Sequence, residues 1–372
     1  MAGFHPSRLL LIEQSEVQLF QIEQQLIKLG FGGIIVPVIA DVLDWARMDA
    51  VMRQYQPAVI FHAAAHKHVN MMEIQPGEAI KNNSFGTASL TQLAALHGVE
   101  RFVMISTDKA VNPTSVMGAS KRLAEVYLQA FAKANPGKTK FVAVRFGNVL
   151  GSSGSVVPIF EKQIAEGGPV MVTDPEVVRF FMTIPEAVGL VLQSCAQGEG
   201  GEVYILDMGK PVKIVDLARQ MIKLSGLQPD RDIEIKFSGL RPGEKLYEEL
   251  RHLRAGCTDT AHPRIKSLAS EPLPLDAMEA QMNWLRQQIH TASTDELKRM
   301  LKEILPEYTP HLSSKKEGET EEKSVVFEKS EHCPLANGQV ENAKPNEYCK
   351  VCGRLQHCVW QHGWNMWAEP VA

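Results

Sequence analysis

Short apolar runs alternate with longer amphipathic stretches over the first half of the chain. Runs such as "RLLLIE" (8–13) and "RFVMIST" (101–107) are apolar over most of their length, which is typical of buried strands. Stretches such as "SEVQLFQIEQQLIKLG" (15–30) repeat apolar residues at helical spacing instead. This alternation predicts a parallel, doubly wound α/β sheet with helices on both faces. Ligands of such sheets bind at the carboxyl ends of the strands, so chemistry is expected there.

The pattern becomes more mixed after about Gly151, where short strands (203–209 and 232–239) flank an amphipathic helix (213–226). We therefore expect a domain over 1–310 whose smaller α/β substrate lobe lies mainly within 151–310. The run "SSKKEGETEEKS" is charged and has little apolar surface to bury, which predicts a disordered linker over 311–330. A tail rich in Cys and Trp then occupies 331–372.

Composition narrows the class of protein. The 372 residues are 44% hydrophobic, and the formal net charge of -4 offers no overall basic surface, so nucleic acid is not an expected partner. No apolar run approaches the length that crosses a bilayer, and the first residues lack the layout of a signal peptide. These features predict a cytoplasmic protein.

Acidic residues follow two of the expected strands. Glu13 ends the first apolar run and Asp41 follows the run that begins at 33. In dinucleotide-binding folds an acidic residue at the end of the second strand accepts hydrogen bonds from the adenosine ribose, which makes Glu13 a candidate ribose contact. Asp41 is a candidate adenine contact. Taken alone, each is more often an ordinary surface carboxylate.

The segment "FHAAAHKHV" (61–69) places small residues at a strand end, where they would let a cofactor approach the backbone. Close packing of a helix on the strand is the alternative. His62, His66 and His68 invite a metal interpretation, but no acidic or Cys cluster completes a site.

Three further segments carry candidate chemistry. "STDK" (106–109) sets a hydroxyl, a carboxylate and an amine at one strand end, where they could divide acid and base roles or form a surface ion pair. "RFGNVLGSSGSVVP" (145–158) could offer backbone N–H groups to phosphate, or could be a flexible connection. In "GLRPGEKLYEEL" (239–250), Arg241 could clamp a diphosphate and Glu244 could accept from a ribose, or the segment could be a charged turn before a helix.

Six segments, taken in order, resemble one family. They are "FHAAAHKHV", "NNSFGT", "RFVMISTDKAVNPTSVMGASKR", "KFVAVRFGNVLGSSGSVVPIF", "RFFMTIPEAV" and "GLRPGEKLYEEL". Together they resemble the nucleotide-diphosphate-sugar 4,6-dehydratases of bacterial polysaccharide biosynthesis, in the extended short-chain dehydrogenase/reductase superfamily. The resemblance covers about 8–310. It implies a Rossmann-like fold, bound NAD, a UDP-N-acetylglucosamine-like substrate and a homo-oligomer.

The resemblance also implies roles for individual residues. Asp108 would be the acid toward the sugar C6 hydroxyl, Lys109 the base at C5 and Thr107 the group that holds the C4 hydroxyl. Lys121 would bind the nicotinamide ribose. The remaining implied contacts are Ala63, Lys67 and Asn83 to NAD, and Asn148, Arg179, Arg241 and Glu244 to the UDP moiety.

Met117 stands four residues before Lys121, where many members of the superfamily have a proton-transferring Tyr. A thioether cannot transfer a proton in this role. The resemblance assigns the Met to one branch of the family and leaves Asp108 or a water as the acceptor of the C4 hydroxyl proton.

The chain departs from the family pattern at its start. The family opens with a strand and a glycine-rich turn that holds the NAD pyrophosphate at a helix N-terminus. "RLLLIEQSE" matches the family's second strand, so we expect a sheet without its first strand and weak or absent NAD binding. A non-catalytic protein that binds sugar nucleotides or a partner is the alternative to an enzyme.

The tail carries "CKVCGRLQHC", whose Cys-x-x-Cys-Gly turn suits two ligands of a tetrahedral zinc site. Cys349 and Cys352 would be joined by Cys358 and by His362 or Cys333. Free thiols or a redox pair are the alternatives.

Overall fold

The computed structural model describes residues 1–152, 154–249, 256–268 and 273–313. The predicted linker beyond 313 and the predicted zinc ligands Cys349, Cys352, Cys358 and His362 therefore lie outside the described residues. The strands are β1 (Leu9–Glu13), β2 (Ile35–Ile39), β3 (Val59–His62), β4 (Arg101–Ile105), β5 (Lys140–Arg145), β6 (Asn148–Val149), β7 (Val170–Val172), β8 (Val178–Arg179), β9 (Phe181–Met182), β10 (Glu202–Leu206), β11 (Val212–Lys213), β12 (Ile235–Phe237), β13 (Cys257–Asp259) and β14 (Ile265–Leu268).

The α-helices alternate with the strands in the first half of the chain, as the sequence pattern predicts. They are α1 (Glu16–Lys28), α2 (Trp45–Tyr55), α3 (Val69–Ile74), α4 (Pro76–Ala79), α5 (Gly86–Leu96), α6 (Val116–Ala134), α7 (Val156–Ala165), α8 (Ile184–Gln197), α9 (Ile214–Leu224), α10 (Leu275–Gln288) and α11 (Thr294–Ile304). A π-helical turn (Ile80–Phe85) joins α4 to α5. None of the helices within the described ranges is both long and apolar enough to cross a membrane.

The main sheet has six strands in the order β13-β14-β10-β5-β4-β3. Strands β3, β4, β5 and β10 are parallel, but β14 runs antiparallel to β10, and β13 runs antiparallel to β14. The prediction of a wholly parallel sheet is therefore wrong at this edge. Only a short turn separates β13 from β14, and so short a connection allows only an antiparallel pairing.

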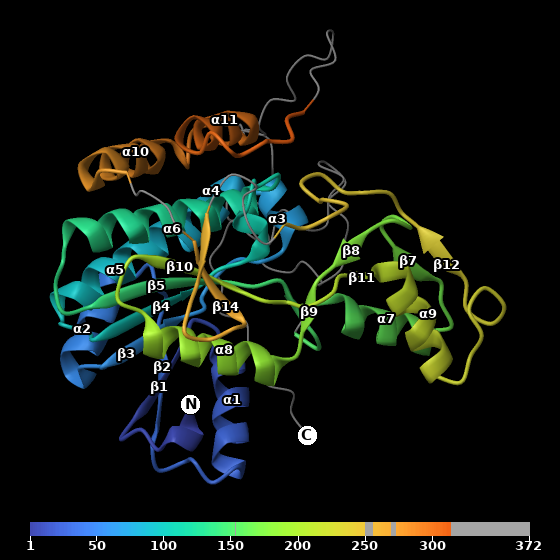
Figure 1. Ribbon diagram of the computed structural model, residues 1–372, viewed down its shortest axis with the longest axis horizontal. Helices are drawn as coiled ribbons and strands as arrows, with labels where there is room; N and C mark the ends of the chain where they lie inside the picture. Colours follow the sequence, from blue (N-terminus) through green and yellow to red (C-terminus); the bar gives the residue numbers. More distant parts are fainter. Residues whose placement is uncertain (153, 250–255, 269–272, 314–372) are drawn as a thin grey trace, which may run out of the picture. The chain divides into compact units, whose positions relative to one another are not determined.

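Helices cover both faces of the main sheet, because its strands are apolar on both sides. In β4, Phe102 and Met104 belong to the core shared with α5 and α6, whereas Val103 belongs to the core shared with α8. Successive side chains of a strand point to opposite faces, so alternate residues fill two separate cores. Figure 1 shows α6 and α8 on opposite sides of the strands.

Strands β1 and β2 form a separate, parallel two-stranded sheet. Among the described residues, β1 is paired only with β2 and β3 only with β4. Apolar side chains on these strands are partly exposed, with Ile12 at 38% and Val59 at 40%. Each sheet fragment therefore presents an unpaired, partly apolar edge within the described chain.

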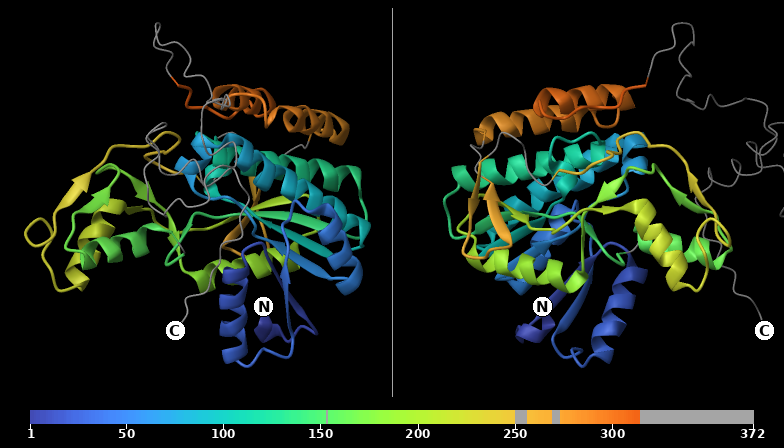
Figure 2. Two further views of the ribbon diagram at one scale, coloured as in Figure 1. Left: turned by 180° about the vertical axis from the view of Figure 1, so that it is seen from behind. Right: turned by 45° about the vertical axis from the view of Figure 1, so that its right-hand side comes forward.

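The buried helix α6 sets the geometry of the strand ends. Ser115 caps it, since its Oγ accepts from the Gly118 N–H at 3.1 Å. A Cβ at Gly118 would lie 2.2 Å from the backbone oxygen of Lys109, so only Gly lets the helix start this close to the end of β4. The C-terminal pair α10 and α11 lies along the side of α6 away from the sheet (Figure 2).

The smaller lobe has its own apolar core. Helices α7 and α9 pack against β7, which pairs in parallel with β12. The other described elements of 151–310 do not all belong to this core, because β10 and β14 belong to the main sheet, α8 packs on one face of that sheet, and α10 and α11 cover α6.

Candidate functional site

The turn after β4 carries the buried carboxylate of Asp108, which is 0% exposed. Its backbone N–H donates to the Phe146 oxygen at 3.1 Å, which ties this turn to the end of β5. The Thr107 hydroxyl and the Lys109 amine both donate to Asp108 Oδ1, each at 3.0 Å. Asp108 Oδ2 is buried and has no hydrogen-bond partner in the described part of the chain. A buried carboxylate oxygen is costly without a partner, so Oδ2 is a candidate contact for a ligand.

Gly147 leaves room for that oxygen. A Cβ at this position would lie 2.9 Å from Asp108 Oδ2, closer than real side chains come. The Gly in "RFGNV" therefore lets the loop after β5 pass close to the buried carboxylate without a side chain that would collide with it.

Lys109 joins residues from separate parts of the chain. Its Nζ lies 3.4 Å from Asn148 Oδ1 and 3.6 Å from Glu248 Oε1, besides its bond to Asp108. Burial by itself would lower the pKa of Lys109, but Asp108 and Glu248 together raise that pKa above its ordinary value. The amine is therefore an ammonium at neutral pH in the ligand-free protein.

Lys121 lies one turn beyond Met117 on α6, and its Nζ is buried with no hydrogen-bond partner among the described residues. Burial lowers the pKa of Lys121 to about 8, although Glu125 opposes the shift. His62 at the end of β3 is close enough for Lys121 to act on it electrostatically. Burial, and then Lys121, lower the pKa of His62 to about 3, so this imidazole is neutral at physiological pH.

Asn83 is fully buried and braces the loop after β3. Its side chain accepts from the His66 N–H at 2.7 Å and donates to the His66 oxygen at 3.0 Å and to Ser120 Oγ at 2.9 Å. It thereby links the loop that holds Ala63 and Lys67 to the residue before Lys121. Ala63 and Lys67 are themselves exposed on that loop.

Glu13 and Asp41 lie at the carboxyl ends of neighbouring strands. The Ala40 N–H donates to the Glu13 backbone oxygen at 3.2 Å, which sets these two ends side by side. Glu13 Oε1 accepts from the Ser15 N–H, and Asp41 Oδ1 accepts from the Leu43 N–H, each at 2.9 Å. Both carboxylates thus cap the turn that follows their own strand.

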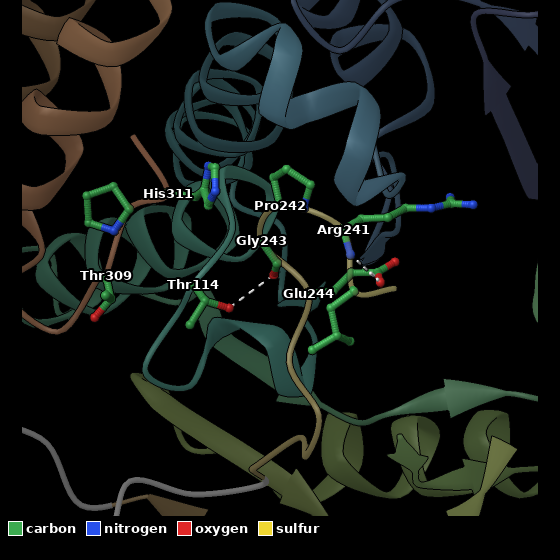
Figure 3. Close-up of a pocket in the computed structure, with 9 residues that line it drawn as sticks. Thr114, Arg241, Pro242, Gly243, Glu244, Thr309 and His311 are labelled. Carbon is green, nitrogen blue, oxygen red and sulfur yellow. Dashed lines mark hydrogen bonds between the residues drawn. The ribbon is translucent and has the colours of Figure 1, made fainter. Parts of the chain in front are cut away.

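The four predicted substrate contacts divide into two groups. Asn148 and Arg179 belong to the Lys109 cluster, where Arg179 Nε lies 3.8 Å from Glu248 Oε1. Arg241 and Glu244 instead form a turn, in which the Arg241 N–H donates to Glu244 Oε2 at 3.2 Å. This turn lines an open pocket with Thr114 and with Thr309, Pro310 and His311, and the Arg241 side chain points away from His311 (Figure 3).

Sequence reasoning missed two buried acids. Glu248 is 8% exposed and lies between Lys109 and Arg179, and the 239–250 motif did not predict a role for it. Nothing in the sequence separates Glu248 from the adjacent Glu249. Glu125 pairs with Arg145 beneath the site, and its position four residues after Lys121 was the one available signal.

The chain is similar in sequence to proteins of known name. The chain is 57% identical over 252 residues to the capsular polysaccharide biosynthesis protein CapD of Staphylococcus aureus, covering 67% of this chain and 42% of that protein. It is 38% identical over 212 residues to a UDP-N-acetylglucosamine 4,6-dehydratase (inverting) of Campylobacter jejuni, covering 56% of this chain and 60% of that protein. The chain thus spans less than two thirds of the length of each of these relatives.

Among solved structures, the fold is similar to that of Pen from Bacillus thuringiensis, with a TM-score of 0.66 and 31% identity over 77% of this chain and 91% of that one. The predicted Rossmann-like α/β fold is confirmed by the likeness to solved nucleotide-sugar dehydratase and epimerase structures, with a mixed main sheet in place of a parallel one. The polysaccharide biosynthesis protein family matches residues 1–270. The chain belongs to that family.

Proposed function

We propose that this chain carries the catalytic residues of an NAD-dependent 4,6-dehydratase that acts on a UDP-N-acetylhexosamine in polysaccharide biosynthesis. The observation that carries the proposal is the cluster of Thr107, Asp108 and Lys109, in which Asp108 Oδ2 is buried and has no hydrogen-bond partner among the residues that the structure describes. Dehydration needs an acid at one carbon and a base at its neighbour, and these side chains supply both types of group. The name of the Campylobacter jejuni relative supports the same reaction.

In the proposed reaction Asp108 gives a proton to the departing C6 hydroxyl and Lys109 takes the proton from C5. Thr107 holds the C4 hydroxyl. Lys109 carries a proton in the ligand-free protein, because neighbouring carboxylates raise its pKa. Its role as base therefore requires that proton to leave before C5 is attacked. The C4 hydroxyl proton goes to Asp108 or to a water, since Met117 cannot accept it.

The residues present suit both ends of NAD. Lys121 Nζ is buried, has no hydrogen-bond partner within the described ranges, and fits a nicotinamide ribose hydroxyl. Asn83 ties the loop that holds Ala63 and Lys67 to Ser120, next to Lys121. Glu13 and Asp41, at neighbouring strand ends, fit the adenosine ribose and the adenine. When bound, NAD supplies hydride acceptance at sugar C4 and hydride return at C6.

The uridine diphosphate is proposed to bind at Asn148, Arg179, Arg241 and Glu244. Arg179 adjoins the catalytic cluster, and its planar guanidinium suits phosphate oxygens. Arg241 lies on the exposed turn shown in Figure 3 and would reach the nucleotide from a different segment than Arg179.

We further propose that tight NAD binding needs one more parallel strand between β1 and β3. The described strands run β2-β1 in one sheet and β3-β4-β5-β10 in the other. A strand between them would complete the strand order of dinucleotide-binding folds, and the turn after that strand normally holds the pyrophosphate.

We therefore test a fusion protein that carries a strand, a glycine-rich turn and a helix ahead of residue 1. We expect this fusion to bind NAD at least about tenfold more tightly than residues 1–372 alone. Calorimetric titration measures the difference. The matched control fuses the same segment with its turn glycines replaced by Val, which blocks the approach of the pyrophosphate. Equal NAD affinity in all three proteins would reject the proposal that tight NAD binding needs an extra strand.

The proposed activity is tested by incubating residues 1–372, and the fused form, with UDP-N-acetylglucosamine and NAD. We expect a nucleotide sugar that is lighter than the substrate by one water. Mass spectrometry separates this product from a C4 epimer, whose mass is unchanged. If the product is a C4 epimer, the protein is an epimerase rather than a dehydratase. If both forms bind the sugar nucleotide but yield no product, the result favours a non-catalytic sugar-nucleotide-binding protein.

A further inference from the structure

Glu248 is a buried carboxylate held between two cations. Its Oε1 lies 3.6 Å from Lys109 Nζ and 3.8 Å from Arg179 Nε. Its Oε2 is buried with no hydrogen-bond partner in the described part of the chain. Burying a carboxylate is costly unless opposite charges are close, so the two cations are what make this position tolerable.

The backbone fixes Glu248 in this place. The Val178 N–H donates to the Leu246 oxygen at 3.0 Å, and Arg179 Nη1 donates to the same oxygen at 3.2 Å. The segment that ends in Glu248 is thus laid along β8, while Lys109 comes from the turn after β4. Glu248 therefore links the segment that lies along β8 to the turn after β4, at the end of the main sheet.

We propose that Glu248 is a positioning residue that sets both the place and the charge of Lys109. The inference rests on the proposed function, because the charge of Lys109 matters only if that amine takes part in proton transfer. The charged groups facing the amine are Asp108 from its own turn, Glu248 from the 239–249 segment and Arg179 from β8.

The effects of these groups have opposite signs. Asp108 and Glu248 each raise the pKa of Lys109, and Arg179 lowers it, against the lowering caused by burial. Removing the charge of Glu248 should therefore increase the fraction of free amine at a fixed pH. Removing the charge of Arg179 should decrease that fraction.

The test is competitive acetylation of the folded protein at mildly alkaline pH, followed by mass spectrometry of the peptide that contains Lys109. Only the free amine reacts, and the Lys109 side chain is 21% exposed. Exposed Lys236 in the same sample is the internal reference. An opposite charge at this distance typically shifts a pKa by one to three units, so Glu248→Gln should speed labelling of Lys109 by at least about tenfold.

Three further variants separate the effect of charge from the effect of loosened structure. Glu249→Gln removes the adjacent carboxylate, which contacts Lys245 and Asn112 rather than Lys109, and should leave the labelling of Lys109 unchanged. Arg179→Gln should slow labelling, whereas a general opening of the site would speed it. Circular dichroism spectra check that each variant is folded, and Glu248→Asp, which keeps the charge, should label nearly as slowly as the parent chain.

The proposal is overturned if folded Glu248→Gln labels Lys109 at the parent rate. It is also overturned if Glu248→Gln and Arg179→Gln both label Lys109 faster than the parent chain does. If Glu248→Gln does not fold, the Arg179→Gln result decides alone, because slower labelling supports the charge cluster and unchanged labelling rejects it. The experiment uses neither NAD nor sugar. Its failure is therefore distinct from a failure of the proposed dehydratase activity.

Discussion

Asp108→Asn and Lys109→Ala are each expected to lower the rate of dehydration by roughly 10²–10⁴-fold, the usual contribution of a positioned acid or base. Asn is close to Asp in size but cannot give a proton to the C6 hydroxyl, and Ala removes the amine altogether. The measurement is the initial rate of product formation by the most active form of the protein, with NAD and sugar nucleotide saturating.

Met117→Leu is the control for these two variants. Met117 is buried on α6, 5% exposed, and a Leu of similar volume keeps its packing. Its thioether has no proton to transfer, so the rate should change by less than about threefold. A rate lost in Met117→Leu but kept in Lys109→Ala would reverse the assignment of roles.

Glu125→Gln is expected to lower the free energy of unfolding by about 3–5 kcal/mol, because it removes one partner of a buried ion pair. Glu125 Oε1 accepts from Arg145 Nε at 2.7 Å and from Ser106 Oγ at 2.6 Å, and both charged side chains are 0% exposed. The change would leave the Arg145 guanidinium without its counter-charge under β4 and β5. Urea unfolding measures the difference.

The matched control is Glu166→Gln, which removes a surface carboxylate that lies 3.8 Å from Lys162 and is 61% exposed. Exposed pairs contribute little, so its effect should stay below about 1 kcal/mol. If Glu125→Gln unfolds at the same urea concentration as the parent chain, the buried pair does not stabilise this sheet.

The same pair predicts how stability depends on pH. Burial would raise the pKa of Glu125, but Arg145 and its other partners lower it below the ordinary value. A carboxyl whose pKa is lower in the folded state stabilises the fold above its unfolded pKa and loses that contribution as pH falls through the folded value. The stability difference between the parent chain and Glu125→Gln should therefore shrink on acidification below about pH 4.3, the ordinary pKa of a Glu.

The alternating apolar runs predicted the main strands and helices correctly, because the central strands β4, β5 and β10 are buried over most of their length and carry apolar residues on both faces. The antiparallel edge was missed because β14 alternates buried Ile265 with exposed Lys266 and is too short to give a clear pattern. The cluster of Thr107, Asp108 and Lys109 was predictable because adjacent residues at one strand end stay together in the fold. Its pairing with Glu248 depends on long-range backbone contacts, which no local pattern encodes.

In the reaction that we propose, Lys109 and Asp108 remove water from a UDP-N-acetylhexosamine across C5 and C6. The most direct measurement is the reaction of UDP-N-acetylglucosamine in deuterium oxide, followed by nuclear magnetic resonance of the product. The C5 proton is taken by the protein and the returning proton comes from solvent, so we predict a 4-keto-6-deoxy sugar that carries deuterium at C5. A product that keeps its original C5 proton, or a C4 epimer that keeps its C6 hydroxyl, would contradict the account.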